Sequence, residues 1–429
     1  GHAAAVNGNH FVSNSEGKAR RRSTRCCVAG GGPAGMMLGY LLARAGVEVV
    51  VLEKHDDFLR DFRGDTVHPS TLRTMQELGL LEDFLRLPHQ RLERLDGHFG
   101  KNRVHLADFA GLPKSYGFVA FMPQWDFLKF IAEKAKRFPH FSVLMGANVT
   151  ELLRDGPRVL GVRAESHDGP LEVRAPLTIA ADGRHSTVRE LSGLTLRDLG
   201  APIDVLWFRV PCGKTKIEPV LAHVDAGRIL VTLDRGDYYQ CAYVIAKGEA
   251  DAIKARGIAA FQADVRAIVP ELDEQLGALH SFDDVKLLTV MVNRLEQWSA
   301  PGVLCIGDAA HAMSPVGGVG INLAIQDAVA ASNLLAEPLR RNRVTEDDLR
   351  RVQARRALPT RVTQALQIQA HERVLGPALA RSDHDFGAPL IFRLATRSSS
   401  LRRLLGRIIG VGVRSEHVRT AEAAPIEHS

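Results

Sequence analysis

The stretch Cys26-Cys27-Val28-Ala29-Gly30-Gly31-Gly32-Pro33-Ala34-Gly35 decides the fold of this chain. Its apolar start predicts a buried strand, and its glycines follow the spacing G-x-G-x-x-G just before a predicted helix over 36–45. A second apolar run ends at Glu53, eighteen residues after the last glycine. In such units the glycines let the backbone approach a pyrophosphate at a helix N-terminus, and the acid binds a ribose hydroxyl. The stretch therefore predicts a dinucleotide site on a parallel α/β sheet.

Composition and charge indicate an ordinary soluble globular protein rather than a nucleic-acid-binding protein. The 429 residues are 45% hydrophobic and 24% charged, and their length allows two domains. The net charge of +6 comes from 331–429, which holds 17 arginines, no lysine and 10 acidic residues. Few aromatic residues alternate with these arginines, so we expect solvated helix faces and no nucleic-acid partner. The five cysteines have no metal-ligand spacing, so we expect reduced thiols in a cytoplasmic protein without a metal site.

Changes in the periodicity of the apolar residues divide the rest of the chain into segments. Alternating runs joined by Asp155-Gly156 and Asp168-Gly169 predict an antiparallel meander within 148–176. Alternation returns over 203–245 and predicts a separate antiparallel sheet. Helical patterns are expected over 69–87, 126–138, 258–268 and everything beyond 321, with breaks at Pro338, Pro359, Pro377 and Pro389.

Two later motifs follow apolar strands. One is Asp182-Gly183, and the other is Gly307-Asp308-Ala309-Ala310-His311, with Pro315-Val316-Gly317-Gly318-Val319-Gly320-Ile321-Asn322 after it. Alone, Asp-Gly after a strand indicates only a turn. Glycines around a proline just before a helix form a backbone nest that accepts an anion, and Asp308 can bind a polyol hydroxyl.

With the three motifs in this order, the chain resembles the single-component (class A) FAD-dependent aromatic hydroxylases of the p-hydroxybenzoate hydroxylase type over about 24–336. The resemblance implies FAD as the cofactor and NADH or NADPH as the co-substrate. In that family NAD(P)H reduces the flavin, oxygen adds at carbon C4a, and the hydroperoxide hydroxylates an aromatic or polycyclic molecule. Because the cofactor does the difficult step, we assign no catalytic side chain.

The resemblance also implies a cofactor-binding set. The residues that would hold the ADP half of FAD are Gly30, Gly32, Pro33, Ala34, Gly35 and Glu53. Arg63 would lie near the cofactor, and Gln124 would contact its flavin side. Asp182 and Gly183 would serve the FAD pyrophosphate and the transient nicotinamide, and Asp308 would bind the ribityl chain. The residues that would line the isoalloxazine ring are Pro315, Gly317, Gly318, Gly320, Ile321 and Asn322.

The expected fold class is α/β, with a Rossmann-like FAD-binding domain, an inserted antiparallel substrate domain and C-terminal helices. The expected division is a disordered tail over 1–23, a FAD-binding domain over 24–96, 118–199 and 300–336, a substrate domain over 97–117 and 200–299, and a C-terminal helical region over 337–429.

Two other functions stay open. A flavin-linked reductase of a prenyl or other unsaturated substrate would share the FAD site without incorporating oxygen. A non-catalytic or peripheral-membrane flavoprotein would dock through the basic, apolar stretch 401–409, for which a helix closing over the FAD domain is the simpler interpretation. His68, His105, His223, Tyr238 and Tyr239 are chemically suitable as a substrate-side base, and we assign none of them that role.

Overall fold

The glycine-rich stretch lies at the centre of a six-stranded sheet in the computed structural model, which describes residues 19–59, 66–214, 216–218, 220–382 and 387–424. Every neighbouring pair in the order β21-β22-β13-β2-β3-β9 is parallel except β21 with β22. Four of these strands are buried at every residue, which explains their continuous apolar runs. The strands are β21 (Ser299–Ala300), β22 (Val303–Cys305), β13 (Leu177–Ala180), β2 (Cys26–Ala29), β3 (Val49–Glu53) and β9 (Phe141–Met145).

Helix α1 (Pro33–Arg44) packs on this sheet and against α4 (Gln124–Ala135) and α8 (Gly320–Arg340). Pro33 suits the first turn of α1, because its missing N–H would have no partner there. Among the described residues, one helical stretch, Val316–Arg340, is long and apolar enough to cross a membrane by length and composition. Its apolar window is 72% buried inside the protein, as in a core helix.

The predicted meander is present and gains a fourth strand. Strands β10 (Asn148–Asp155), β11 (Arg158–Ser166) and β12 (Gly169–Arg174) pair antiparallel, and β1 (Arg20–Ser23) pairs in parallel with β12. The expectation of a disordered tail over 1–23 is therefore wrong for its last four residues. The physical reason is that the edge of β12 offers unpaired backbone groups, which β1 satisfies. Residues 1–18 lie outside the described part of the chain.

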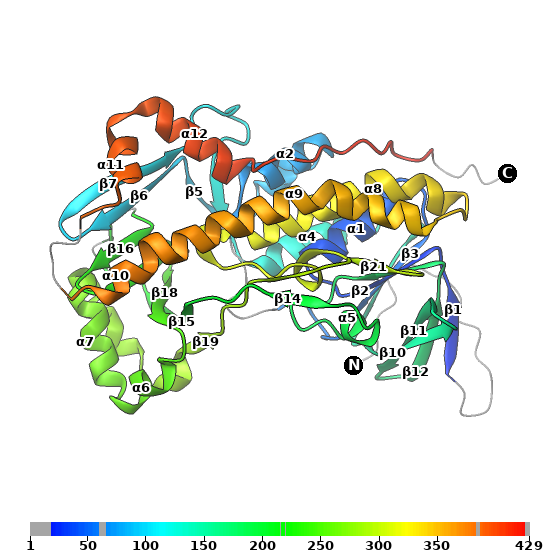
Figure 1. The fold of residues 1–429 in the computed structure, drawn as a ribbon, viewed down its shortest axis with the longest axis horizontal. Helices are drawn as coiled ribbons and strands as arrows, with labels where there is room; N and C mark the ends of the chain where they lie inside the picture. The colour runs from blue at the N-terminus through cyan, green and yellow to red at the C-terminus, as the bar shows by residue number, and fades with distance from the viewer. Residues whose placement is uncertain (1–18, 60–65, 215, 219, 383–386, 425–429) are drawn as a thin grey trace.

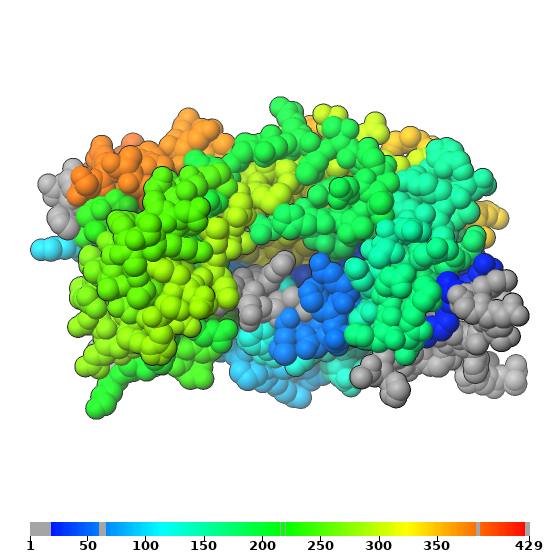
Figure 2. Space-filling model, turned by 90° about the horizontal axis from the view of Figure 1, so that it is seen from below, coloured from blue at the N-terminus to red at the C-terminus, as the bar shows by residue number. Residues whose placement is uncertain are grey.

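A seven-stranded sheet forms the other end of the molecule (Figure 1), and the alternation over 203–245 predicts four of its strands. The sheet is antiparallel as expected except at one place, where residues 222–224 pair in parallel with 97–99. Helix α7 (Ile258–Ile268), with α6 (Ala250–Ala255), packs on one of its faces, where Phe261 contacts Phe208 and Tyr243 edge-on. Seen from below, this green region and the teal meander lie at opposite ends (Figure 2). The strands in spatial order are β19 (Lys286–Leu288), β15 (Ile203–Pro211), β18 (Tyr238–Ala246), β17 (Arg228–Asp234), β16 (Ala222–Asp225), β6 (Arg94–Phe99) and β7 (Asn102–Asp108).

The sheet begins with β6 at Arg94, three residues before the boundary expected at 97. The other domain boundaries stay a prediction. Two small sheets complete the β structure. One has three strands in the order β4 (Thr66–Val67), β8 (Val119–Phe121) and β5 (Gln90–Leu92), and the other pairs β14 (Leu196–Asp198) with β20 (Asn293–Leu295). The short helices are α5 (Thr187–Leu191), η1 (Pro270–Leu272), η2 (Gln275–Ala278), η3 (Phe282–Asp284), η4 (Gly307–Ala309) and η5 (Val316–Gly318).

The C-terminal region is helical only as far as Gly410, so the expectation of helix to the end of the chain is wrong. Residues 411–424 instead bond through their backbone to side chains of α8, with the Glu416 N–H donating to Gln326 and the Arg419 N–H donating to Asn333. Two expected breaks within the helices are also wrong. Pro338 lies in the last turn of α8 and Pro359 lies inside α9 (Glu346–Ala370). Packing of α9 on α8 outweighs the roughly 3 kcal/mol penalty of an interior proline. Conversely, the helix expected over 69–87 is interrupted, because Gly79 adopts a φ of +71°. The two helices that flank Gly79 are α2 (Pro69–Glu77) and α3 (Leu81–Phe84). The helices after α9 are η6 (His371–Leu375), α10 (Gly376–Ala380), α11 (Leu390–Arg397) and α12 (Ser399–Gly410).

Candidate active site

The turn after β2 leaves an open cradle at the N-terminus of α1. A Cβ on Gly30, whose φ is +107°, would lie 2.2 Å from the carbonyl oxygen of Ala181, and a Cβ on Gly35 would lie 1.9 Å from the carbonyl oxygen of Gly30. By contrast, no atom lies within 4 Å of the position a Cβ on Gly32 would take. No side chain caps α1 and no acidic residue lies in its first turn. Its first N–H groups are therefore available to an anion such as a phosphate.

Glu53 ends β3 beside this turn and is 5% exposed. Its Oε2 accepts a hydrogen bond from the Gly31 N–H at 2.7 Å, and its Oε1 lies 2.7 Å from Nδ1 of His55. A carboxylate has about four acceptor positions. These contacts therefore orient Glu53 and still leave it able to bind a ribose hydroxyl.

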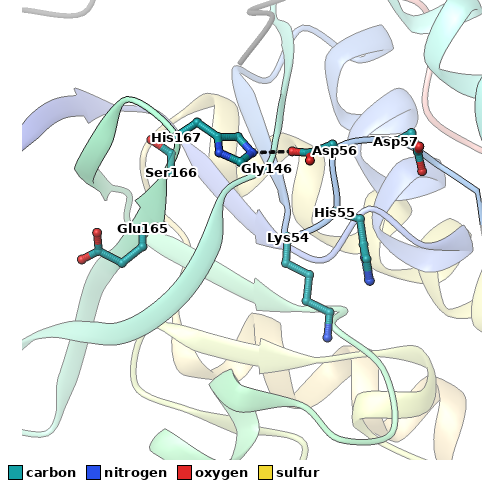
Figure 3. Close-up of a pocket in the computed structure, with 8 residues that line it drawn as sticks. All are labelled: Lys54, His55, Asp56, Asp57, Gly146, Glu165, Ser166 and His167. Atoms are coloured by element: carbon teal, nitrogen blue, oxygen red, sulfur yellow. Dashed lines mark hydrogen bonds and ion pairs between the residues drawn. The ribbon is translucent and has the colours of Figure 1, made fainter. Parts of the chain in front are cut away.

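A hollow of about 480 Å³, lined by polar residues, begins at Lys54, directly after Glu53 in the chain (Figure 3). His167, at the turn between β11 and β12, reaches across to Asp56, with Nε2 2.7 Å from Oδ1, while Lys54 and His55 extend away from this pair. The lining residues are Lys54, His55, Asp56, Asp57, Gly146, Glu165, Ser166 and His167. The meander thus forms one wall of the hollow and the segment after β3 forms the other.

Asp182 and Gly183 lie beside the glycine turn, because β13 neighbours β2 in the sheet. A Cβ on Gly30 would lie 2.7 Å from the backbone nitrogen of Asp182. The Asp182 carboxylate accepts hydrogen bonds from the Ser186 hydroxyl and, at 3.2 Å, from the Val188 N–H. Burial raises the pKa of Asp182, although these hydrogen bonds act in the opposite direction. The aspartate thereby fixes the start of α5 against the site.

Helix η4 brings Asp308 to the same place. A Cβ on Gly307 would lie 3.1 Å from Cβ of Ala34 and 3.4 Å from Cβ of Ala324, so η4 meets the first turns of α1 and α8. Asp308 itself is half-buried. Three motifs that are far apart in the sequence therefore converge at the carboxyl ends of β2, β13 and β22, where open α/β sheets bind their ligands.

The loop 315–322 is held by Asn322. We call it the flavin loop, because the family resemblance predicts that it lines the flavin ring. Gly317 and Gly318 adopt φ values of +82° and +63°. The Asn322 side chain, 4% exposed, donates from Nδ2 to the carbonyl oxygens of Thr66 (3.0 Å) and Gly318 (3.1 Å), and its Oδ1 accepts from the His68 N–H at 2.9 Å. These bonds fix the loop against β4 and the start of α2.

Comparison with known proteins decides what this arrangement is. The model of a family described as "FAD binding domain" matches residues 23–365. The 6-methylpretetramide 4-monooxygenase of Streptomyces rimosus is 33% identical over 411 residues, which cover 94% of this chain and 97% of that protein. The chain belongs to the FAD-dependent aromatic monooxygenases. The monooxygenase is also 28% identical to protoasukamycin 4-monooxygenase of Streptomyces nodosus subsp. asukaensis, over 74% of its own length and 80% of the relative's.

Solved structures share the fold of the monooxygenase. PqsL, a probable FAD-dependent monooxygenase from Pseudomonas aeruginosa, has a TM-score of 0.72 and 23% identity, and the match covers 84% of this chain and 99% of PqsL. The OxyS anhydrotetracycline hydroxylase from Streptomyces rimosus has a TM-score of 0.69 and 24% identity, with 92% and 77% covered. The family resemblance, the α/β fold class and FAD as cofactor, with NAD(P)H as the co-substrate of related monooxygenases, are confirmed.

The structure of the monooxygenase brings most of the predicted cofactor residues together around the glycine turn, η4 and the flavin loop. Gln124 is the first residue of α4 and is partly exposed. Arg63 lies outside the described residues. For all of these residues, contact with FAD stays a prediction.

Helix α9 holds the flavin loop of the monooxygenase through residues that the sequence analysis missed. His371 places Nε2 2.7 Å from Oγ of Ser314, and this Oγ accepts a hydrogen bond from the Val316 N–H at 3.2 Å. Gln367 accepts from the Ser314 N–H at 3.0 Å and donates to the Ser314 carbonyl at 2.9 Å. Two polar residues four apart on a helix are the only sequence signal, and a solvated helix face gives the same pattern.

A buried charge cluster ties α8, α9 and the C-terminal segment together behind the site. Asp327 contacts His311 (Oδ2 to Nε2, 2.5 Å) and Arg356 (Oδ1 to Nε, 2.8 Å), and Arg356 also reaches Glu416 at 3.5 Å. Burial alone would raise the pKa of Asp327, but the partners His311 and Arg356 hold it below its usual value. The cluster also orients η4, because Asp327 accepts a hydrogen bond from the Gly307 N–H at 2.9 Å.

One face of the seven-stranded sheet packs against the flavin loop. Val316 contacts the apolar cluster on this face, which includes Val205 and Val244, with Trp207 beside them. Trp207 is two residues from Val205 on β15, so both side chains point to the same side. Trp207 therefore lies on the sheet face that meets the loop.

Most of the residues considered as a substrate-side base point away from the sheet face that meets the flavin loop. His105 and His223 alternate with Val104 and Val224, which belong to the loop-side cluster, so they point to the opposite face. There His105 contacts Asp96 at 2.8 Å, and Tyr239 accepts a hydrogen bond from the Ile217 N–H at 3.1 Å. The other two are on the loop side: Tyr238 lies under the Arg209 guanidinium, and buried His68 has Nδ1 2.9 Å from the carbonyl oxygen of Ile409.

Proposed function

We propose that this monooxygenase hydroxylates a polycyclic aromatic compound bound between the flavin loop and the seven-stranded sheet. The observation that supports the proposal is the contact of Val316 with the sheet face that carries Val205, Val244 and Trp207. An apolar wall with an indole suits a flat, fused-ring substrate. Relatives named for 6-methylpretetramide and anhydrotetracycline support the same class.

We further propose how the chain holds FAD. The pyrophosphate would lie over Gly32 at the N-terminus of α1, where the Cβ position is open. The ribose of the ADP half would contact Glu53, beside the hollow in Figure 3. Asp308 would bind the ribityl chain, and the isoalloxazine ring would lie against the flavin loop.

The division of labour follows from this arrangement. Bound FAD supplies the activation of O₂, with two electrons from NAD(P)H; one oxygen atom enters the substrate and the other leaves as water. The sheet face and the flavin loop orient the ring and exclude water. Asn322 and Ser314 keep the loop in one conformation through the hydrogen bonds described above.

The test is oxygen incorporation by the FAD-loaded chain. NAD(P)H consumption is followed with a panel of polycyclic and single-ring phenols under ¹⁸O₂, and the products are analysed by mass spectrometry. We expect a polycyclic phenol to accelerate NAD(P)H oxidation and to gain one labelled oxygen. Reduction of an unsaturated compound without label would assign the chain to the reductase alternative instead.

A variant pair tests the position of the substrate. Trp207→Leu should raise KM for the polycyclic substrate several-fold, because it removes the indole from the proposed wall. Tyr239→Phe changes an aromatic residue on the opposite face and should leave KM unchanged. Equal effects of the two substitutions would contradict the proposed binding face.

A further inference from the structure

Helices α11 and α12 form an exposed surface that is both apolar and positively charged. Ten large hydrophobic residues are exposed in the described part of the chain, and five of them lie here. Leu390 is 66% exposed and Leu404 is 53% exposed. The full set is Leu390, Ile391, Leu394, Leu404 and Ile408. We call this surface, with its arginines, the C-terminal helix pair.

The charge of the C-terminal helix pair has one sign. The segment 390–410 contains five arginines and no lysine, aspartate or glutamate. Arg402 is used internally, since it donates to the carbonyl oxygens of Ala395 and Thr396 at 2.9 Å and so fixes the turn between the helices. The other four arginines are exposed and make no ion pair with a described residue; they are Arg393, Arg397, Arg403 and Arg407.

The inner face of the pair packs on the rest of the protein. The helices lie at a corner of the molecule beside β6 and β7 (Figure 1). A Cβ on Gly406 would lie 1.9 Å from the carbonyl oxygen of Asp108, and Phe392 packs on Phe99 with ring centroids 6.0 Å apart. The expectation that 401–409 closes over the FAD domain is therefore wrong in the main, because α12 packs chiefly on β7 of the seven-stranded sheet. The exposed leucines and isoleucines are not needed for this packing.

We propose that the C-terminal helix pair docks the monooxygenase on an anionic lipid surface. Helices that lie in a membrane interface combine basic residues with exposed Leu and Ile in this way. Arginine is attracted to anionic headgroups, while the apolar side chains enter the acyl boundary. A second copy of the chain fits less well, because a two-fold contact would place the arginines of one pair against those of the other.

Docking would also place an apolar cavity near the lipid. This cavity of about 230 Å³ lies between α12, α9 and the flavin loop, and its walls include Ile408, Leu366 and Val319. Ile408 thus belongs both to the exposed surface and to the cavity wall.

The test is co-sedimentation of the FAD-loaded full chain with vesicles. The vesicles are pure phosphatidylcholine or phosphatidylcholine with phosphatidylglycerol, each at low and high salt. We expect binding to the phosphatidylglycerol vesicles at low salt, and at least about a tenfold weaker partition on pure phosphatidylcholine or at high salt. A chain that stays in the supernatant with phosphatidylglycerol vesicles at low salt would overturn the proposal.

Two double variants separate lipid docking from other occupants. Both Leu394→Ser/Leu404→Ser and Arg403→Gln/Arg407→Gln should lose binding about tenfold. The control Leu287→Ser/Arg350→Gln should not, because Leu287 is on β19 at the opposite edge of the sheet from β7 and Arg350 is exposed on α9. Flavin absorbance and thermal unfolding confirm that each variant is folded.

Two outcomes would reassign the surface. If only the arginine variant lost binding, the face would bind anionic headgroups through charge alone, and the proposed docking, in which the exposed leucines and isoleucines enter the acyl boundary, would be overturned. If the chain ignored vesicles but formed a dimer that Leu394→Ser/Leu404→Ser dissociated, the face would belong to a second copy. Either result would overturn lipid docking without affecting the hydroxylase proposal, because oxygen incorporation is measured without lipid.

Discussion

His371, directly after α9, and Ser314, directly before the flavin loop, form a buried hydrogen bond, with Nε2 2.7 Å from Oγ. His371 is 0% exposed and Ser314 is 1% exposed. The chain takes a wider, π-helical turn from His371 to Leu375 (η6), and such turns are frequent at functional sites. The bond therefore couples the conformation of the flavin loop to α9.

His371→Ala should loosen the flavin loop. The substitution leaves the Ser314 hydroxyl without its buried partner, which we expect to lower the free energy of unfolding by about 1–3 kcal/mol and to shift the absorbance spectrum of bound flavin. His371→Gln should restore part of the spectrum, and His280→Ala, at an exposed position, should change neither quantity. An unaltered flavin spectrum in a folded His371→Ala protein would show that the histidine does not position the loop.

Gly32→Ala and Gly35→Ala should fail in different ways. No atom lies within 4 Å of a Cβ on Gly32, so the apoprotein of this variant should have the same Tm as the wild-type apoprotein. It should not bind FAD, because the methyl group occupies the proposed phosphate position. A Cβ on Gly35 would lie 1.9 Å from the carbonyl oxygen of Gly30, so Gly35→Ala should destabilise the protein itself. Thermal unfolding measures the loss of stability, and the ratio of flavin to protein absorbance measures the loss of FAD. A normal FAD content in Gly32→Ala would contradict the proposed position of the phosphate at Gly32.

Asp308→Ala should weaken FAD binding by about ten- to a hundredfold, the effect of losing one charge-assisted hydrogen bond. The measurement is flavin retention during dialysis, followed by titration of the apoprotein with FAD. Asp251→Ala, at an exposed position on α6, is the control and should retain FAD normally. The proposed ribityl contact is wrong if the two variants retain FAD equally.

Arg356→Met should destabilise the protein strongly. It leaves Asp327 and Glu416 as buried carboxylates without their shared guanidinium, which we expect to lower the free energy of unfolding by about 3–5 kcal/mol. Arg355→Met is the matched control, since this neighbour also pairs with Glu416 but is partly exposed, and its loss should be under about 1 kcal/mol. Urea unfolding measures both, and adding Glu416→Gln to Arg356→Met should recover part of the loss.

Stability should fall in mild acid through buried histidines. Burial, helped by His98, lowers the pKa of His223 to about 4, and burial also lowers the pKa of His68. The unfolded chain binds these protons near pH 6.5 while the folded chain does not, so the free energy of unfolding decreases as pH falls. For His223 the decrease between pH 7 and 5 is about 2 kcal/mol. Urea unfolding at several pH values should show a flatter dependence for His223→Gln, and an unchanged slope would contradict this assignment.

Local patterns predicted the FAD-binding core well. The glycine turn and the strand ending at Glu53 follow from residue types that allow few backbone alternatives. Tight turns require glycine and buried strands require continuous apolar runs, and both requirements act within a few residues. The helix breaks predicted at Pro338 and Pro359 are absent, because the packing of the long helices α8 and α9 outweighs the low helix propensity of proline.

The sequence by itself determined the family, the cofactor and the order of the three motifs along the chain. Only the tertiary structure decided which distant side chains meet: His371 with Ser314, Arg356 with Asp327 and Glu416, and β1 with the edge of β12. It also decided that α12 packs chiefly on the seven-stranded sheet, with Leu404 and Ile408 exposed. The physical reason is that buried polar groups and strand edges must be satisfied by whichever partner the fold brings near, and sequence spacing does not specify that partner.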